Sequence, residues 1–312
     1  MKRVLVIRLG AMGDILHALP AAESLRACGA AHITWIVKPQ FRELLEGGGV
    51  AGEILEYRRR GLRALLGSLA ALRRQPFDLA VDFQGLIQSA VVARLSRAAR
   101  ILGFGRSALR EPLAALFYDE RVQTGATHVV EKNLDLAAAA GAAQRVLRFP
   151  LPEGREEGTL PPDPFLLASP FAGWGSKQWP LSHWLELASA ARRELGLPLV
   201  FNVSPAQAAA LASQSDVLVH VSSVAGLIHA TRRAAAVIGV DSGPLHLAAA
   251  LGRSGVAIYG PTDPRRNGPF SQRIRVLRHP SAATSYHRGS QPDASMLAIP
   301  PQQVLAALRE VL

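Results

Sequence analysis

Short apolar runs alternate along the chain with longer stretches rich in Ala, Leu and Arg. In the first half, the apolar runs predict strands at 4–7, 33–37 and 79–82. The longer stretches predict helices at 15–27, 61–74, 88–95 and 132–140. Strands that alternate with helices in this way are typical of a parallel sheet whose strands are joined by crossover helices.

The second half repeats this alternation after a break. Residues 149–165 gather prolines, glycines and acids without any periodicity, which is typical of a linker. Beyond the linker, apolar runs predict strands at 165–168, 199–202, 217–220, 235–240 and 255–259. The stretches between and after them predict helices at 182–195, 206–212, 224–231, 244–251 and 301–311.

The pattern as a whole predicts an α/β protein with two Rossmann-like, doubly wound parallel-sheet domains that face one another across a cleft. We place the first domain at 1–155 and the second at 156–312, and the last helix is a candidate to pack back on the first domain. A chain of 312 residues is long enough to bury two such cores.

Composition narrows the class of protein. Hydrophobic residues make up 49% and charged residues 19%, which fits a globular chain rather than a disordered one. The net charge of +11 indicates an anionic partner such as a nucleic acid, a phosphorylated substrate or a membrane surface, although an Arg-rich genome would produce the same excess. The single cysteine, Cys28, excludes an internal disulfide and fits a reducing compartment. No apolar run suits a signal peptide or a spanning helix, so we expect a soluble, cytoplasmic protein.

The first candidate for chemistry is Asp14, in the segment "GAMGD" that follows the first predicted strand. Aspartate at the start of a helix is a good N-cap. A carboxylate at the carboxyl end of a parallel strand also suits a general base. Gly10 and Gly13 do not complete the GxGxxG fingerprint of dinucleotide enzymes, which argues against nicotinamide-dependent oxidoreduction. The spacing alone leaves the cap and the base both open.

The second candidate is the segment "VIGVDSGPLHLAAALG". An apolar strand ends there in Asp241, a Ser-Gly turn follows, Pro244 opens a helix and His246 lies in its first turn. The amides of such a first turn are available to a phosphate. The alternative is a capped turn in which His246 is an ordinary buried polar residue.

Two further segments carry positive charge. The Gly-rich loop "FAGWGSKQWP" contains Lys177, the single lysine of the second half, which suits a phosphate contact or is an ordinary surface charge. The segment "YRRRGLR" places four arginines within seven positions. Such a cluster binds phosphates or carboxylates, or it is simply a solvated face.

Together these segments resemble one family, the ADP-heptose:lipopolysaccharide heptosyltransferases, which are GT-B glycosyltransferases of family nine. The resemblance spans nearly the whole chain and rests on "GAMGDILHALPA", "DFQGLIQSA", "REPLAALFY", "KQWP", "DSGPLHLAAAL" and "YGPTDP". The second and third of these segments look like the type I members, which add the first heptose. The set is specific, although no single segment is.

The resemblance implies transfer of L-glycero-D-manno-heptose from ADP-heptose to the Kdo residue of the lipid A inner core, with inversion, in lipopolysaccharide core biosynthesis. Asp14 matches the family's proposed catalytic base, which takes the proton of the attacking acceptor hydroxyl. The transition state is expected to resemble an oxocarbenium ion, as in inverting glycosidases. The resemblance implies no metal and no cofactor besides the ADP-heptose donor, and no DxD pair is placed to bind a metal.

By the same resemblance, Lys177 matches the lysine that contacts the donor diphosphate, where preorganised donors stabilise developing charge. The residues implied to bind the donor are Gly173, Lys177, Gln207, Ser222, Asp241, Ser242, Gly243, Pro244, Leu245 and His246. Gln207 stands where the family commonly has a glutamate that contacts the ribose. This departure leaves the identity of the sugar nucleotide open.

The implied acceptor, Kdo-lipid A, is anionic. The residues that match the family's basic acceptor-side loop are Arg58, Arg59, Arg60 and Arg63. We expect peripheral contact with the cytoplasmic face of the inner membrane and no nucleic-acid partner. Two alternatives stay open, a family nine transferase with another nucleotide sugar or a later core acceptor, such as a type II enzyme, and a nucleotide-binding module without catalysis.

Overall fold

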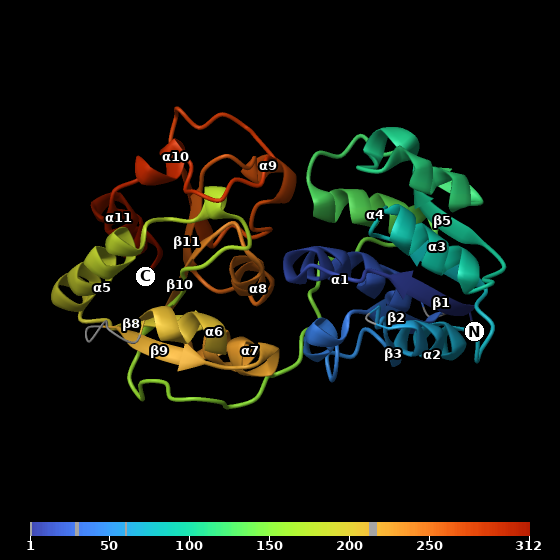
Figure 1. Ribbon diagram of the computed structural model, residues 1–312, viewed down its shortest axis with the longest axis horizontal. Helices are drawn as coiled ribbons and strands as arrows, with labels where there is room; N and C mark the ends of the chain where they lie inside the picture. Colours follow the sequence, from blue (N-terminus) through green and yellow to red (C-terminus); the bar gives the residue numbers. More distant parts are fainter. Residues whose placement is uncertain (1, 29–30, 60, 212–216) are drawn as a thin grey trace. The chain divides into compact units, whose positions relative to one another are not determined.

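The computed structural model describes residues 2–28, 31–59, 61–211 and 217–312 (Figure 1). The chain divides into two compact units, Met1–Pro152 and Glu153–Leu312. Among the helices of these described segments, none combines the length and the apolar character needed to cross a bilayer.

The first unit is built on a six-stranded sheet in which all neighbouring strands are parallel, in the order β3-β2-β1-β4-β5-β6. Its strands are β1 (Lys2–Ile7), β2 (Ala31–Val37), β3 (Glu53–Glu56), β4 (Leu79–Asp82), β5 (Ile101–Phe104) and β6 (Glu120–Val122). The chain proceeds from β1 toward one edge and then returns to the other side of β1 through β4. The point between β1 and β4 is therefore a topological switch point, where ligands of doubly wound sheets bind.

Helices cover both faces of this sheet. They are α1 (Met12–Ala27), α2 (Leu62–Leu72), α3 (Ile87–Leu95) and α4 (Val129–Ala139), with shorter 3-10 turns η1 (Pro39–Leu44), η2 (Arg106–Ala108) and η3 (Pro112–Phe117). α1 packs against α4 on one face. α2, α3 and η3 close the other face over a cluster that includes Leu5, Ile7 and Ala80 of the sheet.

The second unit repeats this plan with a parallel sheet in the order β12-β11-β10-β7-β8-β9. Its strands are β7 (Leu166–Ser169), β8 (Leu199–Val203), β9 (Leu218–Val221), β10 (Ala236–Val240), β11 (Gly255–Tyr259) and β12 (Ile274–Arg278). Here the order reverses between β7 and β10, which is the corresponding switch point.

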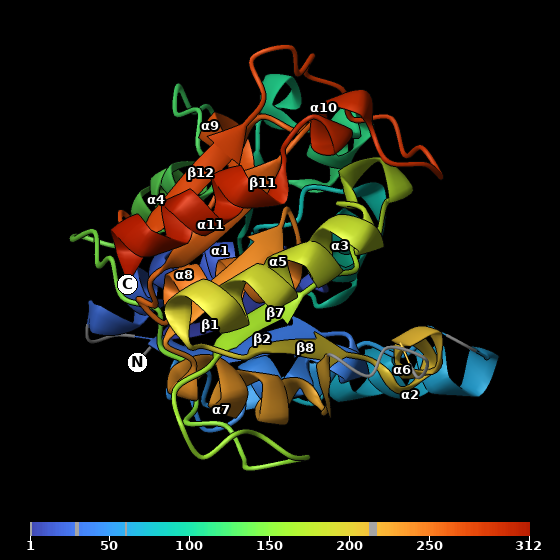
Figure 2. The same cartoon turned by 90° about the vertical axis from the view of Figure 1, so that its left-hand side faces the viewer.

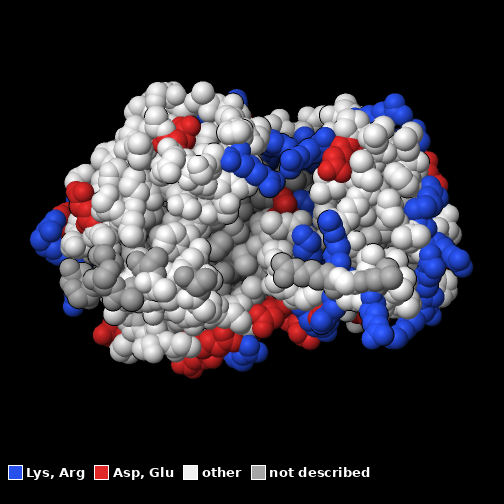
Figure 3. All heavy atoms as spheres, in the orientation of Figure 1, with Lys and Arg blue, Asp and Glu red and all other residues white. Residues whose placement is uncertain are grey.

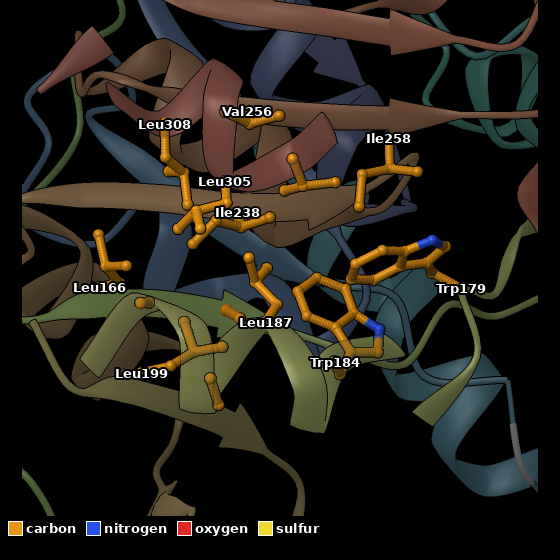
Figure 4. Close-up of a cluster of buried hydrophobic side chains, with 14 of the residues drawn as sticks. Leu166, Trp179, Trp184, Leu187, Leu199, Ile238, Val256, Ile258, Leu305 and Leu308 are labelled. Atoms are coloured by element: carbon orange, nitrogen blue, oxygen red, sulfur yellow. The ribbon is translucent and has the colours of Figure 1, made fainter. Parts of the chain in front are cut away.

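The helices of the second unit are α5 (Leu181–Leu195), α6 (Pro205–Ala208), α7 (Val224–Arg233), α8 (Gly243–Ala250), α9 (Pro264–Asn267), α10 (Ala294–Leu297) and α11 (Pro301–Val311), with 3-10 turns η4 (Gly175–Lys177) and η5 (Ala209–Leu211). α5 and α11 lie side by side over one sheet face (Figure 2). Their side chains Trp184, Leu187, Leu305 and Leu308 form the core with the strand residues below them (Figure 4). The last helix, α11, thus packs on α5, β11 and β12 of its own unit.

The predicted strands all exist, within two residues at each end, but four strands were not predicted. β3, β6 and β12 lie at the edges of their sheets, and charged residues interrupt their apolar pattern. β5, "ILGF", is fully buried but only four residues long. The predicted helix 206–212 is instead the short α6 followed by η5, with residue 212 outside the described segments.

Candidate active site

Asp14 lies in the first turn of α1, at the switch point of the first unit. The N-cap of this helix is Ala11, so the interpretation of Asp14 as the N-cap residue is wrong. Asp14 is the third helical residue, and its Oδ2 accepts a hydrogen bond from the Ala11 amide at 3.2 Å. Its Oδ1 forms an ion pair with Arg8 Nη2 at 2.8 Å. The Asp14 side chain is nevertheless 47% exposed, which leaves it accessible to a substrate.

The partner of Asp14 in this ion pair, Arg8, was not predicted as a site residue. Its side chain is only 8% exposed, and it also donates to the backbone carbonyl of Phe83, just after β4. Next to it, the Leu9 amide donates to Gln84 Oε1 at 2.8 Å. These contacts join the carboxyl ends of β1 and β4 and fix the position of the Asp14 carboxylate. The signal that could have identified Arg8 is its position as a charged residue directly after a buried apolar strand.

A buried carboxyl group supports the loop that receives Arg8. Asp82, the last residue of β4, is fully buried and accepts hydrogen bonds from Tyr118 Oη at 2.7 Å and Ser89 Oγ at 2.8 Å. The amides of Gln84 and Gly85 also donate to it, at 2.9 and 3.2 Å. Burial raises the pKa of Asp82, and these four donors oppose that rise. Asp82 therefore organises residues 83–86 rather than meeting a substrate.

Removing the Tyr118 hydroxyl tests this support. Tyr118→Phe is expected to lower the free energy of unfolding by about 1–3 kcal/mol, because the buried Oδ2 of Asp82 loses one of its two side-chain donors. The measurement is urea unfolding followed by circular dichroism. Tyr286→Phe is the matched control, since Tyr286 is 42% exposed and its ring contact with Arg266 survives the change. Equal losses in the two variants would contradict a structural role for the Asp82 network.

The second cluster of candidate residues lies at the switch point of the second unit. Asp241 follows β10, Ser242 is the N-cap of α8, and the helix begins at Gly243, one residue before the predicted start. Pro244 is thus the second helical residue, and Leu245 packs against Gly239 of β10. The first-turn amides have no partner within the helix itself. The buried Ser242 Oγ also has no hydrogen-bond partner among the described residues.

Asp241 lies within hydrogen-bond distance of side chains from the loops after β7 and β11 and from α8 and α9. Lys177 Nζ, from the loop after β7, donates to its Oδ2 at 2.6 Å, and Thr262 Oγ1, from the loop after β11, donates to the same oxygen at 2.8 Å. His246 Nε2 lies 3.3 Å from Oδ1. Asn267 Nδ2 lies 3.4 Å from both oxygens. Lys177 and His246 were predicted from the sequence, whereas Thr262 and Asn267 were not.

The charges in this cluster are arranged around an ionised carboxylate. Burial by itself raises the pKa of Asp241, but the hydrogen bond and charge of His246 and the charge of Lys177 outweigh it and hold the pKa well below its usual range. Asp241 is therefore an anion at neutral pH, and it balances the charge of Lys177, whose side chain is 13% exposed. Lys177 Nζ also lies 4.1 Å from the centroid of the Trp174 ring.

Three other residues were predicted to bind the donor. Gln207 lies in α6 after β8, Ser222 follows β9, and Gly173 lies in the loop after β7. Ser222 Oγ accepts from Asn202 Nδ2 at 3.0 Å. Gln207 turns back toward its own helix, where its Oε1 lies 3.0 Å from both the amide and the hydroxyl of Ser204. Gly173 is exposed, and a side chain there would meet no atom within 4 Å. The structure does not bring these three residues into contact with the Asp241 cluster.

Glu157, which was not predicted as a site residue, supplies a carboxylate next to Ser223. Its Oε2 accepts from the Ser223 amide at 2.8 Å, and its Oε1 lies 3.0 Å from Ser223 Oγ. The backbone hydrogen bond from Ser223 lowers the pKa of Glu157 most, and Arg155 lowers it further. Glu157 therefore anchors the start of α7.

The arginine cluster follows β3 and therefore lies at the carboxyl ends of the strands of the first sheet, as Asp14 does. Arg58 pairs with Glu56 at 2.5 Å, so part of its charge is already balanced. Arg59 and Arg63 are exposed and form no ion pair with any residue that the structure describes. Arg60 lies outside the described residues.

Comparison with known proteins assigns the chain to a family. The model of glycosyltransferase family 9 (heptosyltransferase) matches residues 68–294. Lipopolysaccharide heptosyltransferase 1 of Pseudomonas aeruginosa is 29% identical over 86% of this chain and 82% of its own length. Lipopolysaccharide heptosyltransferase 2 of Escherichia coli is 32% identical over 48% of this chain and 47% of its own length.

The fold has a close counterpart among solved structures. The E. coli heptosyltransferase WaaC with ADP superposes with a TM-score of 0.81 at 24% identity, over 99% of this chain and 100% of that one. That structure is a GT-B heptosyltransferase, which confirms the predicted fold class of two Rossmann-like parallel sheets. Since the family model covers most of the sequence, the chain belongs to glycosyltransferase family 9, the heptosyltransferase family.

Proposed function

We propose that this glycosyltransferase moves L-glycero-D-manno-heptose from ADP-heptose to the Kdo residue of the lipid A inner core, with inversion at the anomeric carbon. The observation that carries the proposal is the match to heptosyltransferase 1 over most of the chain. The match to heptosyltransferase 2 covers only about half of it, which favours the type I assignment.

In this mechanism the two clusters have separate tasks. Asp14 accepts the proton of the acceptor hydroxyl as that oxygen forms its bond to the anomeric carbon. The bond between the anomeric carbon and the β-phosphate oxygen breaks, and the electron pair stays on the departing ADP. Lys177 and the first-turn amides of α8 bind the diphosphate and stabilise the charge that it gains.

The other contacts with the nucleotide-sugar donor are assigned to residues at the carboxyl ends of the strands of the second sheet. Asp241 and His246 orient Lys177, Ser242–Leu245 form the turn around the diphosphate, and Ser222 lies on the adenine side. We assign Gln207 and Gly173 to the ribose and phosphate contacts of the same donor. Gln207 carries no charge, and this keeps a related family 9 transferase with another nucleotide sugar, or a later core acceptor, as the second candidate.

The acceptor is expected to approach the arginines that follow β3. Arg58, Arg59, Arg60 and Arg63 would meet the carboxylates and phosphates of Kdo-lipid A, for which guanidinium groups are well suited. Because this acceptor is a membrane lipid, we propose that the protein acts peripherally on the cytoplasmic face of the inner membrane. The mechanism requires no metal ion.

A transfer assay with purified protein tests the proposal. ADP-heptose and Kdo-lipid A are expected to give a heptosylated product, while UDP- and GDP-sugars give none. Kdo-lipid A that already carries one heptose serves as the acceptor for type II activity. Transfer only to that second acceptor, or only from another nucleotide sugar, would replace the type I assignment with the second candidate.

The role of the arginine cluster in binding the acceptor is tested separately. The double variant Arg59→Ala/Arg63→Ala is expected to raise KM for Kdo-lipid A about tenfold or more and to leave KM for ADP-heptose unchanged, because charge-assisted hydrogen bonds contribute about 1.5–3 kcal/mol each. The control is Arg73→Ala/Arg74→Ala, which removes the same charge just after α2. If both double variants change KM for the acceptor equally, Arg59 and Arg63 belong to a solvated face.

A further inference from the structure

The charge balance around Asp241 leaves the donor diphosphate short of positive charge. Lys177 forms a short ion pair with Asp241, and both side chains are largely buried. A lysine that already balances a carboxylate offers less net charge to a second anion. The leaving ADP gains a negative charge during transfer, so a cation without an acidic partner is needed beside Lys177.

The segment that follows β12 brings such a cation to the Lys177 loop. The amide of Ser176 donates to the Gly289 carbonyl at 3.1 Å, and Ser176 Oγ donates to the His287 carbonyl at 3.3 Å. The Asp293 amide in turn donates to the Ser176 carbonyl at 3.3 Å. These bonds fasten residues 287–293 to η4, the turn that ends in Lys177.

Arg288 lies in this fastened segment, between His287 and Gly289, whose carbonyls accept the two bonds from Ser176. Its Cζ is 5.0 Å from the centroid of the Trp174 ring, which also carries Lys177 Nζ at 4.1 Å. Arg288 is exposed and forms no ion pair with any residue of the described segments. Stacking on Trp174 restrains the guanidinium but leaves its charge and its N–H donors available to an anion.

The neighbouring surface adds to the positive potential. Arg266 Cζ lies 4.7 Å from the centroid of the Tyr286 ring, so a second arginine contacts the same segment. Figure 3 shows Lys and Arg side chains gathered around the position of α9, which contains Arg266. Asp263, the N-cap of α9, already pairs with Arg265 at 2.7 Å.

We propose that Arg288 is a further donor-binding residue, which contacts the diphosphate of the nucleotide sugar and offsets the charge that develops on the departing ADP. The inference rests on the proposed function, because it takes an ADP-sugar as the donor. Trp174 acts as a positioning residue that places Arg288 and Lys177 at one diphosphate. Lys177 meets the diphosphate while held by Asp241, and Arg288 supplies the charge that has no internal partner.

The test compares Arg288→Gln with Arg192→Gln, a matched variant of an exposed arginine on α5. Calorimetric titration is expected to show that Arg288→Gln raises the Kd for ADP about tenfold, equivalent to ~1.4 kcal/mol, and leaves the Kd for adenosine unchanged. In the transfer assay kcat is expected to fall about tenfold to a hundredfold, since a group that stabilises developing charge acts mostly in the transition state. Arg288→Lys should restore part of both losses and Arg288→Glu should deepen them.

The outcomes separate this inference from the proposed function. An ADP affinity of Arg288→Gln equal to that of Arg192→Gln would overturn the inference, whatever sugar the enzyme transfers. Weaker ADP binding in Arg288→Gln, together with no heptose transfer by the unaltered protein, would support the inference and reject heptose as the sugar. Failure of the unaltered protein to bind ADP would overturn both. Equal thermal unfolding of the two variants and the unaltered protein excludes misfolding as the cause.

Discussion

Replacement of Asp14 by asparagine is expected to lower kcat for heptose transfer by about 10²–10⁴-fold, the usual contribution of a positioned general base. Asparagine keeps the size of the side chain and can still accept a hydrogen bond from the Ala11 amide, but it cannot accept the proton of the acceptor hydroxyl. The Kd for ADP is expected to stay unchanged, because ADP is assigned to the second unit. Steady-state kinetics and calorimetric titration of the same preparation measure both quantities.

The change at Asp14 also removes the carboxylate partner of the buried Arg8, so a structural loss has to be separated from a chemical one. Asp119→Asn is a suitable control, because Asp119 also pairs with an arginine, Arg94, at 2.9 Å, in a pair that is exposed on both sides. Thermal unfolding of both variants shows whether Asp14→Asn is folded at the assay temperature. A folded Asp14→Asn variant that keeps more than a tenth of the kcat would rule out Asp14 as the base.

Replacement of Asp241 by asparagine is expected to destabilise the second unit by about 3–5 kcal/mol, because it leaves the largely buried Lys177 without its carboxylate. Denaturant unfolding measures this loss. Glu310→Gln is the control, since Glu310 pairs with Arg275 at the surface and such pairs contribute about 0–1 kcal/mol. The double variant Asp241→Asn/Lys177→Met should recover part of the stability, because it removes the unpaired charge as well. No recovery, or a loss as small as that of Glu310→Gln, would contradict the charge pairing.

Because Asp241 is ionised in the folded protein, we expect the free energy of unfolding to depend on pH. The folded protein holds the pKa of Asp241 below its ordinary value of 3.8, so the stability from this group is present above that value and is lost as the pH falls further. Acid unfolding of the unaltered protein is therefore expected to be steeper below about pH 4 than that of Asp241→Asn. Parallel acid unfolding curves for the two proteins would contradict an ionised Asp241 in the folded state.

The strands that sequence patterning predicted are those with continuous apolar runs, such as β1 and β10. Such strands are buried on both faces by helices, so nearly every position is apolar and the run stands out. β3 and β12 lie at sheet edges, where charged residues such as the half-buried Glu53 and the exposed Arg275 break the run. Their strand conformation follows from pairing with β2 and β11, which local sequence does not encode.

The residues of the candidate site that were predicted from the sequence are likewise those that belong to local patterns. Asp14, Asp241 and His246 belong to compact segments, in which a strand end and a helix start lie within a few residues of each other. Arg8 was missed because its partner Phe83 is 75 residues away. Gln207 was predicted to contact the donor ribose, and this stays a prediction. Its carbonyl oxygen bonds to Ser204, because a glutamine three residues after a serine completes a capping box.

The sequence by itself determined the alternation of strands and helices, the plan of two parallel sheets and the family, because apolar periodicity and short motifs are local properties of the chain. Only the tertiary structure decided the order of the strands, and with it the switch points where Arg8 meets the β4 loop and Lys177 meets Asp241. The physical reason is that parallel neighbours are joined through long crossovers. Groups separated by 64 residues, such as Lys177 and Asp241, therefore become partners only when the sheet assembles.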